Sequence, residues 1–215
     1  MKIQPFILGF GYTNSYVVYY DDRSAYIIDA PNGTKKLQTF IEQNNLKAEA
    51  VFLTHGHYDH ILGLPELRKA YKNIDIYIGK EDFCFLEDEG KANRELLWNQ
   101  REILEQYKDV FSSLPEDLIF YDKSMTRNGE KLFDVIKTPG HTPGSVCLYS
   151  KKDNVLFSGD TLFKEGIGRW DFGGNYSDLC KSIDKLKSLE ESTLVFPGHG
   201  EFTTIAFEKE NNPYL

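Results

Sequence analysis

Three histidines and one aspartate lie within the six residues 55–60, and this cluster constrains the chain more than any other feature of the sequence. The cluster directly follows the short apolar run 50–53, which predicts a buried strand. Imidazole and carboxylate groups are ligands that cations such as Zn²⁺ accept, and several of them on one turn cost little entropy to organise. Residues 55–60 therefore predict a metal site at the end of a strand.

Three further segments have the same character. His141 lies in a tight turn rich in proline and glycine, Asp160 follows the apolar run 155–157, and His199 follows a predicted strand at 193–196. Each of these side chains has a glycine neighbour, which leaves room for an ion. A single histidine is more often an ordinary surface or core residue, and a Gly-Asp pair is more often a turn. The joint pattern favours metal binding, because all five histidines of the chain lie in these loops.

The rest of the chain alternates between strands and helices. Strands are predicted at 16–20, 25–29, 50–53, 74–78, 131–137, 145–149, 155–158 and 193–196, and helices at 35–43, about 60–71 and about 177–189. Thr34 is a candidate N-cap of the first helix. This order predicts an α/β (α+β) fold in which helices cover two sheets. Because no flexible linker interrupts residues 1–215, we expect a single domain.

Residues 81–123 have a helical spacing of apolar residues and predict a helical insertion. Six apolar side chains share one face, which predicts a long amphipathic helix: Leu96, Ile103, Leu104, Tyr107, Val110 and Phe111. Trp98 falls roughly opposite that face by the helical period of 3.6 residues. Because an indole in water is uncommon, we expect Trp98 to contact a partner subunit, the metal cleft or a neighbouring loop.

Composition and charge restrict the classes of partner. The formal net charge of −8 argues against an extended phosphate-binding surface, so no nucleic-acid partner is expected. No apolar run approaches the ~18 residues of a membrane span, and the first residues do not form a secretory signal, so no membrane association is expected. The three cysteines lack C-x-x-C spacing, which indicates reduced thiols in a cytoplasmic protein: Cys84, Cys147 and Cys180. The sequence leaves the oligomeric state open.

The ligand-type segments together resemble the metallo-β-lactamase superfamily in order and spacing. The matching strings are Thr54-His55-Gly56-His57-Tyr58-Asp59-His60, Pro139-Gly140-His141-Thr142-Pro143-Gly144, Gly159-Asp160 and Gly198-His199-Gly200. Within the superfamily the chain looks most like the single-domain glyoxalase II-like hydrolases, with support from residues 168–174 and 212–214. The resemblance covers nearly the whole chain and implies an αββα four-layer sandwich, here with a helical insertion.

Carried over residue by residue, the resemblance implies a site for two divalent metal ions. The implied ligands are His55, His57 and His141 for one ion, Asp59, His60 and His199 for the other, and Asp160 as the bridge. Zinc is expected, with iron or manganese as alternatives. Asp59 and Asp160 are the expected catalytic carboxylates. A hydroxide that bridges the ions would attack a thioester or related acyl bond, as in a hydroxyacylglutathione hydrolase, with no serine or cysteine nucleophile.

The sequence leaves more than one alternative for the substrate and for the class of reaction. Arg169 is a candidate for binding a substrate carboxylate, and a structural pair with Asp171 is the equal alternative. Cys147 alternates with apolar neighbours and is expected in the core. Larger glyoxalase II enzymes use a helical C-terminal domain to bind glutathione, whereas this chain stops soon after His199. An iron-dependent persulfide dioxygenase is the main alternative, followed by a non-catalytic metal scaffold and a nuclease.

Overall fold

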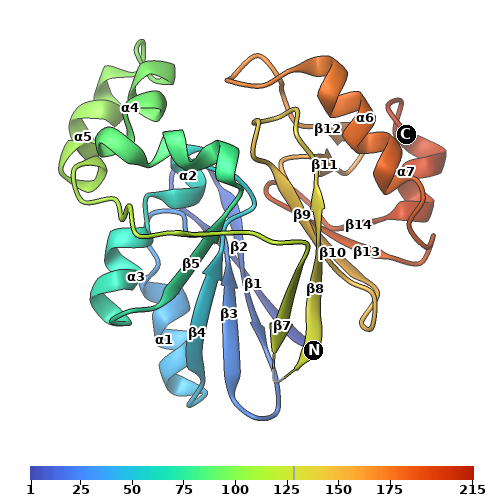
Figure 1. The fold of residues 1–215 in the computed structure, drawn as a ribbon, viewed down its shortest axis with the longest axis horizontal. Coiled ribbons are helices and arrows are strands. Elements are labelled where there is room, and N and C mark those ends of the chain that lie inside the picture. The colour runs from blue at the N-terminus through green and yellow to red at the C-terminus, as the bar shows by residue number, and fades with distance from the viewer. Residues whose placement is uncertain (128) are drawn as a thin grey trace. The chain divides into compact units, whose positions relative to one another are not determined.

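The computed structural model describes residues 1–127 and 129–215, which divide into two compact units (Figure 1). The first unit comprises residues 1–78 and 82–119, and the second comprises residues 79–81 and 120–215. Each unit is built on its own sheet. The single domain expected from the sequence stays a prediction. Among the residues described, no helix has the length and apolar character to cross a membrane.

The first unit is built on a six-stranded sheet. Its strand order is β1 (Lys2–Leu8), β2 (Thr13–Tyr19), β3 (Ser24–Ile28), β4 (Lys47–Phe52), β5 (Asp75–Ile78) and β6 (Ile119–Phe120). The strands predicted at 16–20 and 25–29 form the antiparallel pair β2 and β3, and β3, β4 and β5 run parallel. Parallel pairing brings the carboxyl ends of β3 and β4 to one edge, where the Asp29 N–H donates to the Phe52 carbonyl oxygen (3.0 Å). Residues 55–60 therefore begin beside the end of β3.

The first predicted helix is confirmed, and Thr34 is its N-cap residue as predicted, but without a side-chain capping bond. Helix α1 (Lys35–Gln43) has the expected bounds and buries Leu37 and Ile41. Thr34 precedes the helix, yet its side chain makes no capping hydrogen bond. The Thr34 hydroxyl donates instead to a carboxylate oxygen of Glu66 (2.5 Å). A charged acceptor 32 residues away therefore replaces the local partner that the sequence suggested.

The helix predicted at about 60–71 is wrong as one element, because the chain forms α2 (Tyr58–Ile61) and α3 (Leu64–Ala70). Gly63 lies between them, and its N–H donates to the Ala30 carbonyl oxygen (2.8 Å). A Cβ atom at Gly63 would lie 2.2 Å from the Pro31 carbonyl oxygen, so only glycine allows this approach. Contact with the chain after β3 thus ends α2, and Pro65 in the first turn of α3 starts a new helix.

The insertion contains a 3₁₀ segment η1 (Lys80–Phe85) and two α-helices, α4 (Glu87–Leu96) and α5 (Arg101–Phe111). One long amphipathic helix is therefore wrong, because the chain turns at residues 97–100. Helix α5 keeps most of the predicted apolar face and buries Phe111. Trp98 lies in the turn and is 74% exposed. Asp88, Glu89 and Gly90 have positive φ values of 50–65°, so α4 begins with a left-handed turn.

The second unit is built on another six-stranded sheet. Its strand order is β14 (Thr203–Thr204), β13 (Leu194–Pro197), β10 (Val155–Gly159), β9 (Val146–Ser150), β8 (Glu130–Lys137) and β7 (Ser124–Arg127), and β11 (Leu162–Phe163) pairs separately with β12 (Gly166–Ile167). β10 and β13 run parallel, and the other neighbours are antiparallel. The carboxyl ends of β10 and β13 and the start of β9 therefore share one edge, and Asp160, His199 and His141 come from the loops there.

Helices α6 (Tyr176–Leu186) and α7 (Ile205–Asn211) belong to the second unit (Figure 1). They contribute Ile183, Leu186 and Ile205 to a buried apolar cluster that also contains Cys147 and Val195 from the strands. The sequence predicted α6 and the core position of Cys147, and both are confirmed. This packing holds the strands whose ends carry the ligand-type residues.

Candidate metal centre

Four ligand-type residues of the first unit form what we call the first ligand cluster: His55, His57, Asp59 and His60. The three imidazoles are buried, and the Asp59 side chain is 16% exposed. His60 Nε2 lies 3.7 Å from Asp59 Oδ2. The ligand nitrogen atoms of His57 and His60 each lie within 4.8 Å of one on His55. Residues 55–60 thus bring their polar atoms together within one turn, as the sequence predicted.

Asp29 orients the rings of the first ligand cluster. Its carboxylate accepts hydrogen bonds from the Thr54 N–H (2.7 Å) and the Thr54 hydroxyl (2.8 Å), and it contacts His60 Nδ1 at 2.9 Å. An ionised carboxylate only accepts, so His60 Nδ1 carries a proton, and Nε2 is the bare nitrogen of the neutral imidazole. Sequence reasoning missed Asp29, whose signal was a single carboxylate at the end of an apolar strand.

Thr54 extends the same orientation to His55. The Thr54 hydroxyl has one proton, which it donates to Asp29, and it lies 3.1 Å from His55 Nδ1. It therefore accepts from His55 Nδ1–H, and His55 Nε2 is the nitrogen that can bind a cation. Buried side chains thus select the tautomers of two of the three histidines.

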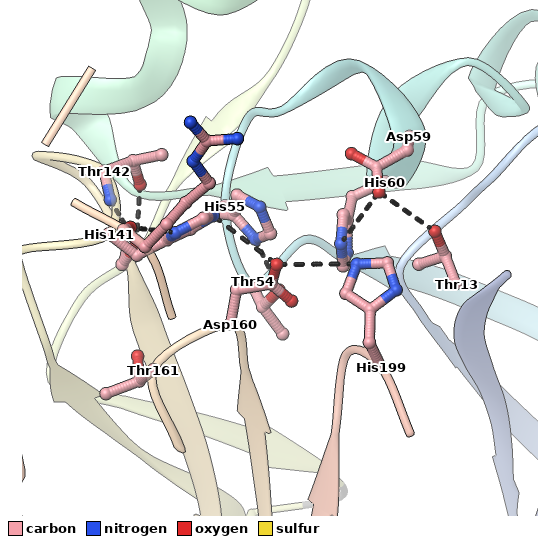
Figure 2. Close-up of polar contacts among 12 residues, drawn as sticks. Thr13, Thr54, His55, Asp59, His60, His141, Thr142, Asp160, Thr161 and His199 are labelled. Carbon is pink, nitrogen blue, oxygen red and sulfur yellow. Dashed lines mark hydrogen bonds and ion pairs between the residues drawn. The ribbon is translucent and has the colours of Figure 1, made fainter. Parts of the chain in front are cut away.

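Asp59 is held by the loop between β1 and β2. The Thr13 hydroxyl donates to Asp59 Oδ2 (3.2 Å), and Figure 2 shows Asp59 between Thr13 and His60. A Cβ atom at Gly11 would lie 2.9 Å from the same oxygen, so the absence of a side chain there leaves room for the carboxylate. These contacts fix a carboxylate beside a bare imidazole nitrogen.

The second unit supplies the second ligand cluster, which consists of His141, Asp160 and His199. Asp160 Oδ2 lies 3.5 Å from His141 Nε2 and 3.4 Å from His199 Nε2 (Figure 2). His141 Nδ1 lies 2.7 Å from the Arg169 carbonyl oxygen, which can only accept. His141 therefore carries its proton on Nδ1 and turns Nε2 toward Asp160. One carboxylate between two imidazoles is the arrangement that a bridging ligand requires.

Glycines of the 168–174 loop make room for the backbone around His141. A Cβ atom at Gly168 would lie 1.8 Å from the Asp160 carbonyl oxygen and 3.1 Å from His141 Nδ1. A Cβ atom at Gly174 would lie 2.0 Å from the Gly140 carbonyl oxygen. Both glycines are therefore required by close backbone packing. This accounts for part of the 168–174 string that supported the narrower family resemblance.

Arg169 pairs with Asp171. Two guanidinium nitrogens of Arg169 each donate to a carboxylate oxygen of Asp171 at 2.8 Å, and the guanidinium lies 5.0 Å from the centre of the Phe172 ring. The hydrogen bonds from Arg169 lower the pKa of Asp171 to about 2. Both partners are more than half exposed. The pair realises the structural alternative for Arg169, and its binding of a substrate carboxylate stays a prediction.

Cys84 and Cys147 do not have the properties of metal ligands or nucleophiles. Burial raises the pKa of the Cys147 thiol to about 11. Partial burial also raises the pKa of the Cys84 thiol, and the nearby carboxylate of Asp82 raises it further. A thiol must lose its proton to bind a metal or attack a carbonyl carbon. The candidate ligands are therefore imidazoles and carboxylates. These donors suit a divalent ion of zinc, iron or manganese.

The chain matches the model described as "Metallo-beta-lactamase superfamily" over residues 8–199. The "Probable metallo-hydrolase YqgX" of Bacillus subtilis is 35% identical over 204 residues, which cover 94% of this chain and 92% of the relative. The "Hydroxyacylglutathione hydrolase GloC" of Haemophilus influenzae is 32% identical over 220 residues, with coverage of 94% and 92%.

The chain is also similar to several solved structures. The chain aligns with the BLEG-1 B3 metallo-beta-lactamase at a TM-score of 0.82 and 36% identity, covering 100% of this chain and 99% of that one. It aligns with TTHA1623 in a di-iron-bound form at a TM-score of 0.80 and 29% identity, covering 99% and 100%. It aligns with ETHE1 from Myxococcus xanthus at a TM-score of 0.75 and 27% identity, covering 99% and 84%.

Proposed function

The chain belongs to the metallo-β-lactamase superfamily, and from this premise we propose that it is a two-metal hydrolase that cleaves thioesters or related acyl bonds. Its mixed α/β architecture is the fold of that superfamily, as the sequence resemblance predicted. The proposal takes a small molecule as the partner, involves neither nucleic acid nor membrane, and places the enzyme in the cytoplasm. Three unbridged cysteines are consistent with that compartment.

The observation that carries the proposal is the orientation of the imidazoles in each ligand cluster. Carboxylate, hydroxyl and carbonyl acceptors hold the Nδ1 protons of His55, His60 and His141, so each presents a bare Nε2. A core histidine that serves only packing does not need an acceptor that fixes the proton on one particular nitrogen. Histidines that bind metals almost always have one. Both units therefore prepare their histidines to bind cations.

We assign the seven ligands to two ions as the family resemblance implies. One ion takes His55, His57 and His141, and the other takes Asp59, His60 and His199. Asp160 serves both, because its Oδ2 already lies within 3.5 Å of one histidine from each set. A shared carboxylate offsets the repulsion between two cations that lie a few ångströms apart.

Bound divalent ions supply a water nucleophile of lowered pKa and polarise the substrate carbonyl group. The protein's own part is to hold the ligands in place. Asp29 and Thr54 keep His55 and His60 in one tautomer, and Thr13 holds the Asp59 carboxylate. Because the thiols of Cys84 and Cys147 have raised pKa values, neither competes as a nucleophile.

Thioesters are the proposed substrate class because of the relative described as a hydroxyacylglutathione hydrolase. An iron-dependent persulfide dioxygenase is the second candidate. The similarity to TTHA1623, solved in a di-iron-bound form, supports iron as an alternative metal, because iron would use the same imidazole and carboxylate donors. The two candidates differ in metal, in cosubstrate and in the bond that is broken.

Elemental analysis of the unsupplemented protein, paired with two assays, tests the proposal. We expect about two zinc ions per chain, hydrolysis of lactoylglutathione and of simpler thioesters, and no oxygen uptake with a persulfide. Removal of the ions with a chelator should abolish hydrolysis, and added Zn²⁺ should restore it. One iron per chain, with oxygen consumed in step with the persulfide, would contradict the hydrolase proposal and establish the second candidate.

Arg169 is the proposed contact for an anionic substrate. The Arg169 guanidinium is paired with Asp171, which is exposed. A substrate carboxylate would therefore have to displace the Asp171 carboxylate from it. We expect Arg169→Ala to raise KM about tenfold for a thioester with a carboxylate and to leave KM for a neutral thioester nearly unchanged. Lys187→Ala is the matched control, because Lys187 forms a similar surface pair with Asp184 at 3.0 Å. Equal losses on both substrates would mean that Arg169 is structural.

A further inference from the structure

The backbone of Gly56, between the proposed ligands His55 and His57, is held on both sides by buried side chains of the insertion. The Gly56 N–H donates to Asp82 Oδ2 (2.8 Å), and the Gly56 carbonyl oxygen accepts from Asn93 Nδ2 (2.9 Å). Asp82 lies in η1 and Asn93 in α4, and both side chains are 0% exposed. Two residues eleven positions apart thus bind the two polar groups of one residue in the metal-binding loop.

Asn93 makes two further contacts that extend this hold. Its Oδ1 accepts from the Tyr58 N–H (3.0 Å), and its Nδ2 also donates to the Phe85 carbonyl oxygen (2.9 Å). The single amide therefore bridges the loop at residues 56–58 and the insertion at residue 85. A buried amide with both donor and acceptor in use fixes the segments it joins, because release would leave several polar groups unsatisfied.

The packing around Gly56 leaves little freedom for the loop to move. A Cβ atom at Gly56 would lie 2.8 Å from Phe85 Cβ and 2.9 Å from the Asp82 carbonyl oxygen. The Phe85 ring lies 5.2 Å from the His57 ring, at an interplanar angle of 73°. The same short segment therefore contacts the backbone before His57 and the imidazole ring of His57.

From these contacts we infer that Asp82 and Asn93 are positioning residues that set the metal affinity of the centre. The inference rests on the proposed two-metal site and concerns the ion assigned to His55 and His57. The direction of each imidazole depends on the backbone at residue 56, since Gly56 connects the two Cα atoms. Loss of either side chain should let the loop adopt several conformations, and binding would then have to select one of them.

Metal affinity measured without substrate tests the inference. We expect Asn93→Ala and Asp82→Ala to raise the apparent Kd for Zn²⁺ about tenfold or more in competition with a chelator. The absorption spectrum of the Co²⁺-loaded protein should change in both variants. Asp82→Asn retains an oxygen that can accept from the Gly56 N–H, so its Kd should stay within about threefold of the starting protein. The double alanine variant should lose less than the product of the single losses, because both act through Gly56.

Asn154→Ala is the matched control for loss of a polar anchor. Asn154 lies in the turn before β10, at the opposite end of that strand from Asp160. It donates to the Ser192 hydroxyl (2.8 Å) and accepts from the Thr193 hydroxyl (2.7 Å). Asn154→Ala should lower the Tm of the metal-free protein without changing the Kd for Zn²⁺. If Asn93→Ala does not fold, the comparison of Asp82→Ala with Asp82→Asn provides the same test.

Two different results would overturn this assignment, and they are distinguishable. If the insertion variants lower the Tm of the metal-free protein but keep the Kd and the Co²⁺ spectrum, Asp82 and Asn93 are structural only. If the unaltered protein binds no divalent ion, the proposed metal centre itself fails. A protein that binds metal but lacks thioesterase activity would refute the proposed reaction and leave the positioning roles intact.

Discussion

The two ligand clusters are held by different means. In the first cluster, side chains hold the ligands: Asp29 and the adjacent Thr54 orient the rings, and Asp82 and Asn93 bind the backbone. In the second cluster, the contacts come mainly from the backbone. A carbonyl oxygen of the 168–174 loop accepts from His141, and glycines of that loop allow the close approach.

This difference predicts how each cluster fails. A side-chain anchor is lost by truncation or by a change from acceptor to donor, at little cost in volume. A backbone anchor survives most side-chain changes but not the addition of a methyl group where no space exists. The first ligand cluster should therefore be sensitive to the chemistry of its anchors as well as to volume at Gly11 and Gly56, whereas the second should be sensitive mainly to volume.

The largest effect is expected from Asp160→Ala. Asp160 lies between His141 and His199, so its loss should empty or scramble both metal positions and lower kcat/KM by more than about 100-fold. Asp59→Ala should mainly weaken the ion assigned to His60. Bound zinc per chain, measured beside kcat/KM, checks this order. Full retention of both ions in Asp160→Ala would contradict the bridging assignment.

Gly168→Ala tests the dependence of the second cluster on volume. The new Cβ atom would lie 1.8 Å from the Asp160 carbonyl oxygen, so the backbone must shift. We expect a loss of about 1–3 kcal/mol in the free energy of unfolding, together with weaker metal binding. Gly166→Ala is the matched control, because no atom lies within 4 Å of its Cβ position. Equal behaviour of the two variants in denaturant unfolding would refute the packing argument.

Asp29→Asn tests the dependence of the first cluster on chemistry. Asn tolerates the positive φ of 57° at this position and has nearly the same volume. Its amide can present only one oxygen, whereas the Asp29 carboxylate uses both of its oxygens as acceptors. We expect metal affinity to fall about 10- to 100-fold with a small change in Tm. A Kd for Zn²⁺ equal to that of the unaltered protein would show that the His60 tautomer does not depend on Asp29.

The smallest effect on catalysis concerns the cysteines, whose effect on stability appears only at high pH. Burial raises the pKa of Cys147 from 9.0 to about 11, so the folded protein keeps a proton that the unfolded chain loses. Stability should therefore fall as the pH rises from 9 to 11, by about 2–3 kcal/mol relative to Cys147→Ala. Denaturant unfolding at several pH values measures this difference. Catalysis near pH 7 should be unchanged in Cys147→Ala and in Cys84→Ala, and loss of turnover with metal retained would indicate a thiol nucleophile.

Local patterns were enough to predict many elements. Alternating or continuous apolar runs predicted β3, β4, β9, β10 and β13, and the apolar spacing predicted α1 and α6. Two predicted helices are each divided in the structure. Gly63, whose N–H donates to the Ala30 carbonyl oxygen, separates α2 from α3, and the turn at 97–100 divides the helix predicted in the insertion. Neither break in the helix is visible in the spacing of apolar residues along the sequence.

The sequence by itself determined which side chains can bind metal and that they follow strands, because ligand type and strand-end position are properties of short segments. Only the tertiary structure decided which nitrogen each oriented histidine presents and what holds it. Those contacts join Asp29 to His60, Asn93 to Gly56 and Arg169 to His141. The partners in each pair lie 28–37 residues apart, so their meeting depends on strand pairing and packing and has no local pattern.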